Sequence, residues 1–256
     1  MSSQLQSNVV SVAYQDLPGA FVSQLKSLQV DFGSESALSL YEWSRSHISS
    51  LYFGTAIEED TDISGETNTL LGNIYVQIDP QRLNDPVYIL GRVAVIAHET
   101  YHLQYSRQVL FHHQYRVINE RNAFVVGQRI ALQGLRAYLQ IHPLHVSVGT
   151  LVDCLQHFRN GDVNVLNQFS PEERSVIQMI FDTSKDRKSI MATNFVLGFA
   201  EDTLELIPEI IIPREDVRSR YPHDLVDQYL DMTNSTHDLF SQRALLVVCR
   251  ELGLTH

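Results

Sequence analysis

The sequence predicts an α+β protein in which a small sheet is formed early and helices make up most of the remaining chain. Short segments rich in β-branched and aromatic residues lie in the first third, whereas apolar residues at helical spacing dominate after Asp79-Pro80. With 256 residues, of which 44% are hydrophobic and 19% charged, the chain can bury one sizeable core or two small ones. We therefore expect one or two compact domains.

Three segments carry strand signals. They are 9–14, 51–57 and 74–78, and each is short and rich in β-branched or aromatic residues. The stretch 58–71 contains five acidic residues and Gly65, so we expect an exposed loop there. Amphipathic spacing at 21–28 and 38–43 predicts two helices that pack on the sheet.

Two long helices are expected next in the chain. The first has Asp85 as its N-cap and Pro86 as its first residue, and it runs toward Tyr105. The second spans about 119–140 and ends before His142-Pro143. Ser170 begins another helix as its cap, and the later helices are expected at 191–206, 223–233 and 235–252.

Composition and charge limit which classes of binding partner and which cellular compartment are expected. The chain has 19 Lys and Arg against 30 Asp and Glu, a formal charge of -11, which argues against nucleic acid or an anionic membrane as a partner. It has no basic and apolar leader and no window of about 18 apolar residues. With only two well-separated cysteines, these features predict a cytoplasmic protein in a reducing compartment, and a signal-independent route of secretion stays open.

The sequence 98–102 reads His-Glu-Thr-Tyr-His, an HExxH motif in a helical context. On a helix, positions i and i+4 lie on one face, so His98 and His102 can reach a single metal ion. Two histidines, one carboxylate and a position left to water describe a hydrolytic zinc site, which makes Zn²⁺ the expected cofactor. Glu99 lies about 100° round the helix, where its carboxylate can act as a general base instead of a ligand.

A second feature supports a metal site. Glu120 lies 18 residues after His102, at the expected start of the next long helix. The same helix face carries a ridge of small residues, namely Ala123, Gly127, Ala131 and Gly134. Small residues let two helix axes approach closely, as a short glutamate needs if it is to share a metal with both histidines. The alternative is that the ridge marks ordinary tight packing and Glu120 has no such role.

From about Ile74 to Gln140 the sequence resembles the gluzincin metallopeptidases, HExxH enzymes whose third ligand is a glutamate on the following helix. The resemblance implies that His98, His102 and Glu120 bind zinc and that Glu99 is the general base for peptide-bond hydrolysis. It also implies that 74–78 is the edge strand that binds an extended substrate. A zincin-like core over 1–141 and a helical C-terminal subdomain over 142–256, in one domain or two, would follow.

The sequence departs from this family at two points. Many gluzincins have an aspartate four residues after the ligand glutamate, which hydrogen-bonds a zinc histidine, but Phe124 stands there. No local motif identifies an oxyanion-stabilising residue. Tyr221, His223 and His237 are weak candidates for this role, and a surface or core role fits each of them better.

The function expected from these observations is a zinc-dependent metalloendopeptidase that acts on a specific protein or peptide, with Glu99 taking a proton from a metal-activated water. The alternative is a catalytically inactive zinc-binding or partner-binding protein with a degenerate zincin fold. An accidental motif is the third interpretation. A preference for basic substrate residues at the acidic stretch 58–66 competes with a purely solvated loop, and the oligomeric state stays open.

Overall fold

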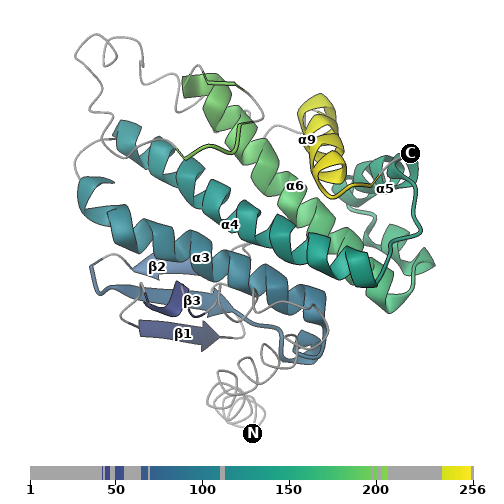
Figure 1. Ribbon diagram of the computed structural model, residues 1–256, viewed down its shortest axis with the longest axis horizontal. Helices are drawn as coiled ribbons and strands as arrows, with labels where there is room; N and C mark the ends of the chain where they lie inside the picture. Colours follow the sequence, from purple (N-terminus) through teal and green to yellow (C-terminus); the bar gives the residue numbers. More distant parts are fainter. Residues whose placement is uncertain are drawn as a thin grey trace, which may run out of the picture.

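The long helices that the structure describes after residue 85 lie together on one face of a small sheet (Figure 1). The computed structural model describes residues 42, 44–46, 50–54, 65–68, 70–109, 113–197, 199–200, 203–206 and 238–254. The strands are β1 (Ser50–Gly54), β2 (Gly65–Asn68) and β3 (Asn73–Gln77). The helices are α3 (Pro86–Val109), α4 (His113–Ile141), α5 (Val148–Arg159), α6 (Pro171–Leu197) and α9 (Asp238–Glu251), with short 3-10 turns η1 (Pro80–Arg82) and η2 (Val163–Gln168). The predicted α+β class is confirmed.

The described sheet is mixed, with the strand order β1-β3-β2. β1 runs parallel to β3, whereas β2 runs antiparallel to it and pairs Thr67 with Ile74. Ile74 and Val76 are fully buried and alternate with half-buried residues, as expected for a strand with one face on the core. β3 leads into η1, whose N-cap Asp79 precedes the first helix of the core.

Two sequence-based predictions about this sheet are wrong. The segment 74–78 is not an edge strand, because β3 lies between β1 and β2. The stretch 58–71 is not wholly a loop, because its residues Gly65–Asn68 form β2, the edge strand beside β3 in the described part of the sheet. The connection to β3 turns at Gly72, whose φ of 70° suits a residue without a Cβ.

The helix α3 begins where its cap predicts. The carboxylate of Asp85 accepts hydrogen bonds from the backbone N–H groups of Val87 at 3.0 Å and Tyr88 at 3.1 Å. Its other oxygen accepts a bond from the Ser175 hydroxyl at 2.5 Å, which ties this helix end to α6. The helix continues to Val109, somewhat beyond the predicted end near Tyr105.

α4 packs antiparallel along α3 at very short range. A Cβ added at Gly127 would lie 3.1 Å from the carbonyl oxygen of Ala94, and one at Gly134 would lie 2.9 Å from a methyl group of Leu90. The close approach predicted from the ridge of small residues is therefore confirmed. α4 begins at His113, earlier than the predicted residue 119, so that Glu120 lies in its second turn.

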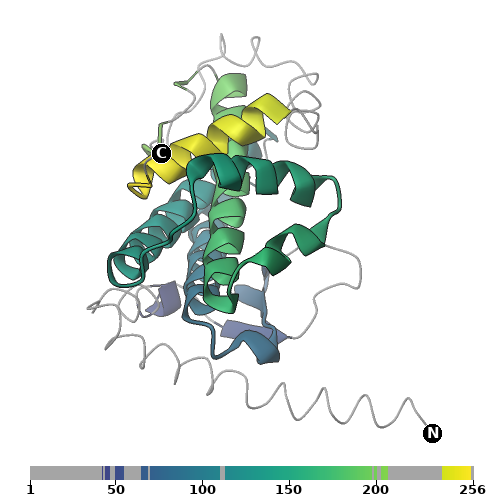
Figure 2. The ribbon, with the colours of Figure 1, turned by 90° about the vertical axis from the view of Figure 1, so that its right-hand side faces the viewer.

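The remaining helices build outward from α4. α6 lies beside α4, α9 packs on α6, and α5 lies against α9 on the side of the helices away from the sheet (Figures 1 and 2). The predicted cap of α6 is confirmed, because Ser170 and Glu173 exchange hydrogen bonds at 3.0 and 3.2 Å. The fully buried guanidinium of Arg187 pairs with Glu251, which joins α6 to α9.

Other helix predictions meet mixed outcomes. α6 is one helix from Pro171 to Leu197, so the predicted helix 191–206 is only its last part, and the prediction is wrong for 199–200 and 203–206. The prediction over 235–252 matches α9. The segments 9–14, 21–28 and 223–233 lie outside the described residues, as does most of 38–43.

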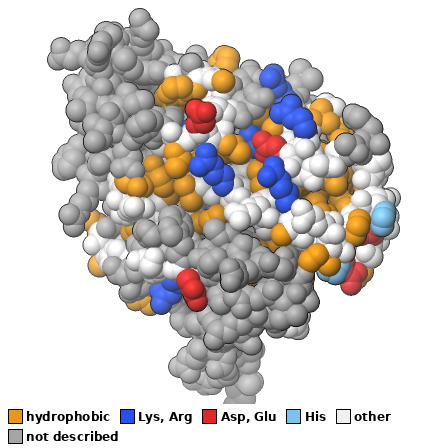
Figure 3. Space-filling view, viewed as in Figure 1, with side chains coloured by type: hydrophobic (Ala, Val, Ile, Leu, Met, Phe, Trp, Pro, Cys, Tyr) orange, Lys and Arg blue, Asp and Glu red, His pale blue; other side chains and the backbone are white. Residues whose placement is uncertain are grey.

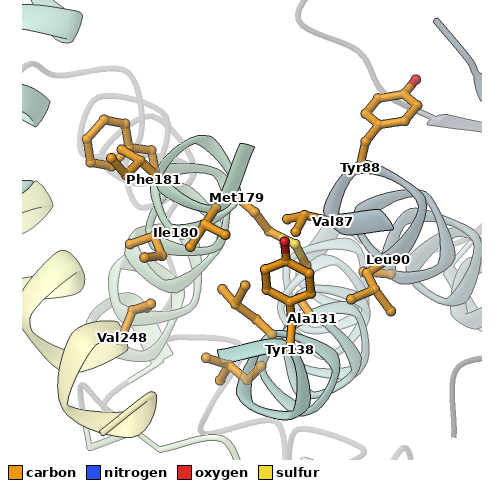
Figure 4. Close-up of a cluster of buried hydrophobic side chains, with 14 of the residues drawn as sticks. Val87, Tyr88, Leu90, Ala131, Tyr138, Met179, Ile180, Phe181 and Val248 are labelled. Carbon is orange, nitrogen blue, oxygen red and sulfur yellow. The ribbon is translucent and has the colours of Figure 1, made fainter. Parts of the chain in front are cut away.

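One hydrophobic cluster runs from the sheet through α3, α4 and α6 to α9. Figure 4 shows its middle, where Ala131 and Tyr138 of α4 and Met179 of α6 lie between Leu90 of α3 on one side and Val248 of α9 on the other. The cluster therefore draws on both parts of the chain, 1–141 and 142–256, and their division into subdomains stays a prediction.

After α6 the structure describes residues 199–200 and 203–206, here called the strap, whose main chain is held by side chains. Arg121 donates to the carbonyl oxygens of Thr203 at 3.2 Å and of Glu205. Arg129 donates to the carbonyl of Leu204 at 2.5 Å, and Asn194 donates to that of Ala200 at 2.8 Å. Asn194 also accepts from Arg121 at 2.7 Å. The buried side chains of Arg121 and Asn194, together with the exposed Arg129, thus fix the path of the strap against α4 and α6.

On the face shown in Figure 3, basic side chains are interspersed with hydrophobic and acidic ones over the described residues. They form no continuous basic stripe on that part of the surface. None of the described helices combines the length and the apolar character that a membrane span requires.

A pair of glycine substitutions tests the close contact of α3 and α4. Gly127→Val should lower the free energy of unfolding by about 1–3 kcal/mol, because its side chain would collide with the backbone of α3. Gly91→Ala in α3 is the control, because its Cβ would meet nothing within 4 Å. It should raise the free energy of unfolding by about 0.5–1 kcal/mol. Urea denaturation measures both, and a harmless valine at position 127 would contradict the close packing.

A pH effect is expected from α6. Burial and the carboxylate of Asp182, one turn earlier, raise the pKa of Asp186 to about 7, although Lys185 and Arg92 oppose the shift. The folded protein then binds a proton at Asp186 more tightly than the unfolded chain, so stability should fall as pH rises from about 4 to about 7. Asp186→Asn should therefore raise Tm relative to wild type at pH 8 but not at pH 4. Equal differences at both pH values would argue against this.

Candidate metal centre

Three predicted ligands meet where α3 and α4 lie closest. The Nε2 atoms of His98 and His102, one turn apart on α3, are 3.1 Å from each other. An oxygen of Glu120 on α4 lies 3.4 Å from Nε2 of His102 and 3.9 Å from Nε2 of His98. Within the described parts of the chain, this is the one group of histidine, cysteine and acidic side chains close enough to hold a metal ion.

These distances can be compared with those of a zinc site. Ligand atoms placed about 2.0–2.1 Å from one ion at tetrahedral angles lie roughly 3.3 Å apart. The observed separations of 3.1, 3.4 and 3.9 Å bracket that value. Two imidazole nitrogens and one carboxylate oxygen are also a ligand set that zinc accepts while keeping a fourth position open. The residues therefore fit a catalytic type of zinc site in both chemistry and spacing.

Neighbouring side chains fix both imidazole rings. Nδ1 of His102 lies 2.5 Å from the side-chain oxygen of Asn119, and a hydrogen bond there leaves Nε2 directed at the site. The ring of His98 packs edge-on against Phe124 with 4.6 Å between the ring centroids. Its Cβ lies 3.3 Å from the position that a Cβ of Gly127 would take. One histidine is thus oriented by a hydrogen bond, and the other is confined by packing.

The pKa values of the two histidines shift in opposite directions. Burial, and then the neighbouring His102, lower the pKa of His98 to about 3. Burial also lowers the pKa of His102, but its hydrogen bonds to Glu120 and Asn119 and the nearby carboxylates outweigh this and raise the value to about 9. A cation that binds here therefore competes with a proton for Nε2 of His102, because a ligating imidazole nitrogen must be unprotonated.

Glu99 lies about 100° round α3 from His98, against the sheet. Its carboxylate accepts a hydrogen bond from the hydroxyl of Thr67 on β2 at 2.5 Å, and only 8% of the residue is exposed. Burial raises the pKa of Glu99, whereas His102 and the Thr67 hydrogen bond lower it. Glu99 is not among the residues that could jointly hold the ion, although its charge interacts with those of His102 and Glu120.

Two residues of this centre escaped the sequence analysis as functional candidates. Asn119 precedes Glu120, and its place beside His102 depends on where α4 begins. Thr67 lies in a stretch whose acidic composition predicted a loop. Within Gly65–Asn68, Thr67 is itself the only β-branched residue, so the local signal for a strand is weak. Tyr221, His223 and His237, the weak oxyanion candidates, lie outside the described residues.

Comparison of the chain with protein-family models, with curated proteins and with solved structures finds no match in any of the three. The chemistry of this centre therefore has to be inferred from its own residues and distances.

The role of Asn119 can be tested by metal affinity. Asn119→Ala removes the acceptor for Nδ1 of His102, so zinc should bind about 10–100-fold more weakly in competition with a chromogenic chelator. Asn119→Asp retains an acceptor at this position and should keep most of the affinity.

The matched control is Asn167→Ala, at an exposed residue of η2 that bonds only to its own turn among the contacts described. It should leave zinc affinity unchanged. Unchanged affinity in Asn119→Ala as well would show that Asn119 does not orient the ligand.

Proposed function

We propose that the protein is a zinc-dependent metallopeptidase of the gluzincin type that hydrolyses peptide bonds in a specific protein or peptide. The observation that carries this proposal is the convergence of His98, His102 and Glu120 beside a glutamate that is not in the ligand set. A purely structural zinc site has no use for Glu99 next to its ligands. Ligands and base together are what metal-assisted hydrolysis requires.

The protein's own residues divide the work. His98, His102 and Glu120 would hold zinc, which supplies a Lewis acid that polarises the scissile carbonyl and makes water a nucleophile near neutral pH. Glu99 accepts a proton from the attacking water on its carboxylate and passes it to the nitrogen of the leaving amine. Asn119 keeps Nε2 of His102 directed at the ion. The Thr67 hydroxyl favours the ionised form of Glu99, in which the carboxylate can accept a proton.

The substrate strand of the proposal is β2. It lies at an edge of the described sheet, and its residue Thr67 contacts the general base, whereas β3 is paired on both sides. An extended peptide that adds to β2 by main-chain hydrogen bonds would run past Glu99. Glu66 is exposed and alternates with Gly65 and Thr67, so its side chain lies on the face away from α3. It therefore lends no support to a preference for basic residues.

The competing function is a partner-binding protein with an inactive zinc site. Phe124 at the position of the family's aspartate favours this alternative, because that aspartate would orient a zinc histidine. Asn119 weakens the argument, since it supplies a hydrogen-bond acceptor for His102 from a different position on the same helix. A cytoplasmic location and a protein or peptide partner stay expectations from the sequence.

The proposal is tested by metal content and cleavage measured on the same samples. Purified wild type should contain near-stoichiometric zinc by elemental analysis and should cleave members of a peptide library. Glu99→Gln should retain zinc and lose cleavage, because it removes the base and keeps the ligands. Glu120→Ala should lose both, because two histidines alone hold zinc weakly.

Glu172→Gln, at an exposed glutamate in the first turn of α6, is the control and should behave as wild type. Wild type that takes up no zinc after reconstitution would refute the metallopeptidase. Stoichiometric zinc without cleavage of any peptide or protein would favour the inactive binding protein.

A further inference from the structure

We propose that the strand β2 is a positioning element for the general base, in which Gly65 makes room for the carboxylate of Glu99 and Thr67 fixes its rotation. This inference rests on the proposed function, since it assigns a role to two residues in that reaction. Neither residue belongs to the motif or to the ligand set.

Thr67 contacts Glu99 at two atoms. Its hydroxyl oxygen lies 2.5 Å from Oε2 of the carboxylate and 3.1 Å from the main-chain oxygen of the same residue. A hydroxyl has one proton to donate, and the shorter contact lies in the range of a bond to a charged acceptor. The hydroxyl therefore bonds one carboxylate oxygen while resting on the backbone of α3, which restrains the rotation of the carboxylate.

Gly65 lies two residues before Thr67, on the same face of β2. A Cβ at this position would lie 2.6 Å from Cγ1 of Val95 and 3.0 Å from both Cγ and Oε1 of Glu99. Its φ is not positive, so backbone conformation does not call for glycine here. The missing side chain is needed for space, and that space is taken by the base and by its neighbour one turn earlier on α3.

The two contacts address different oxygens of one carboxylate. Thr67 bonds Oε2, and Gly65 accommodates Oε1, so the strand encloses the carboxylate from the side opposite the helix. A general base must be held within hydrogen-bond reach of the proton that it accepts, and loss of such a support shifts it by enough to slow the reaction. The sheet register places this support: Gly65 pairs with Val76 and Thr67 with Ile74, both buried on the α3 side.

The test compares variants of the zinc-loaded protein on one cleaved peptide. Thr67→Val keeps the shape and removes the hydroxyl, so kcat should fall at least about 10-fold while KM and zinc content stay as in wild type. Thr67→Ser should restore most of kcat. Gly65→Ala should also lower kcat with zinc retained. Thr183→Val, which removes a buried hydroxyl that bonds only to its own helix α6 among the contacts described, should leave kcat unchanged.

A second readout needs no catalysis. Thr67→Val should lower the urea midpoint of the wild-type protein but should have little effect in a Glu99→Ala background, because the hydroxyl then has no carboxylate to bind. An equal loss in both backgrounds would show that the contact is not formed and would overturn the inference. Coupling combined with an unchanged kcat in Thr67→Val would also overturn it, because the contact would then be structural only.

Failure of the proposed function is distinguishable from both of these results. If zinc-loaded wild type cleaves no peptide, the proposed reaction does not occur and β2 has no catalytic role. The urea cycle then still decides whether the strand holds Glu99.

Discussion

The contact between α3 and α4 at Gly127 and Gly134 sets the geometry on which the rest of the protein depends. At Gly127 the carbonyl oxygen of Ala94 approaches so closely that a side chain would have to displace one of the helices. This spacing lets the short side chain of Glu120 reach the histidines of α3. It also leaves the opposite face of α4 available for packing against α6, on which the later helices then pack. If the axes of α3 and α4 lay farther apart, longer side chains could still fill the core between them. The carboxylate of Glu120 would then be out of reach of the imidazoles of His98 and His102.

α3 lies between two partners and presents different chemistry to each. Toward α4 it turns two imidazoles, and toward the sheet it turns Glu99, about 100° away on the same turn. Each face is completed by its neighbour: Asn119 and Phe124 orient the histidines, and Thr67 bonds the glutamate. A buried carboxylate is costly unless it is hydrogen-bonded, so the sheet makes it possible to keep Glu99 in the interior. The site is thus assembled from three elements, although its motif is confined to one.

The sequence predicted those features that depend on local spacing. The cap at Asp85, the reciprocal hydrogen bonds of Ser170 and Glu173, the shared face of His98 and His102, and the close approach of α4 were predicted from residue types and their spacing within a single helix. The position of β2 does not, because a four-residue strand in an acidic stretch is stabilised by pairing with β3, and its register is fixed by that partner. Which strand is the edge depends on the order β1-β3-β2, a tertiary property. The roles of Asn119 and Thr67 were missed for the same reason, since each depends on a contact between elements.

The strap, residues 199–200 and 203–206, is held through its main chain, since Arg121, Arg129 and Asn194 all donate to carbonyl oxygens. Every amino acid has such a carbonyl, so the donors recognise the course of the segment and not its side chains. Sequence changes within the strap should therefore be tolerated during divergence, whereas the three donors should change slowly. Because Arg121 follows Glu120 directly on α4, a strap whose sequence has changed would still run along the same path beside this candidate metal ligand.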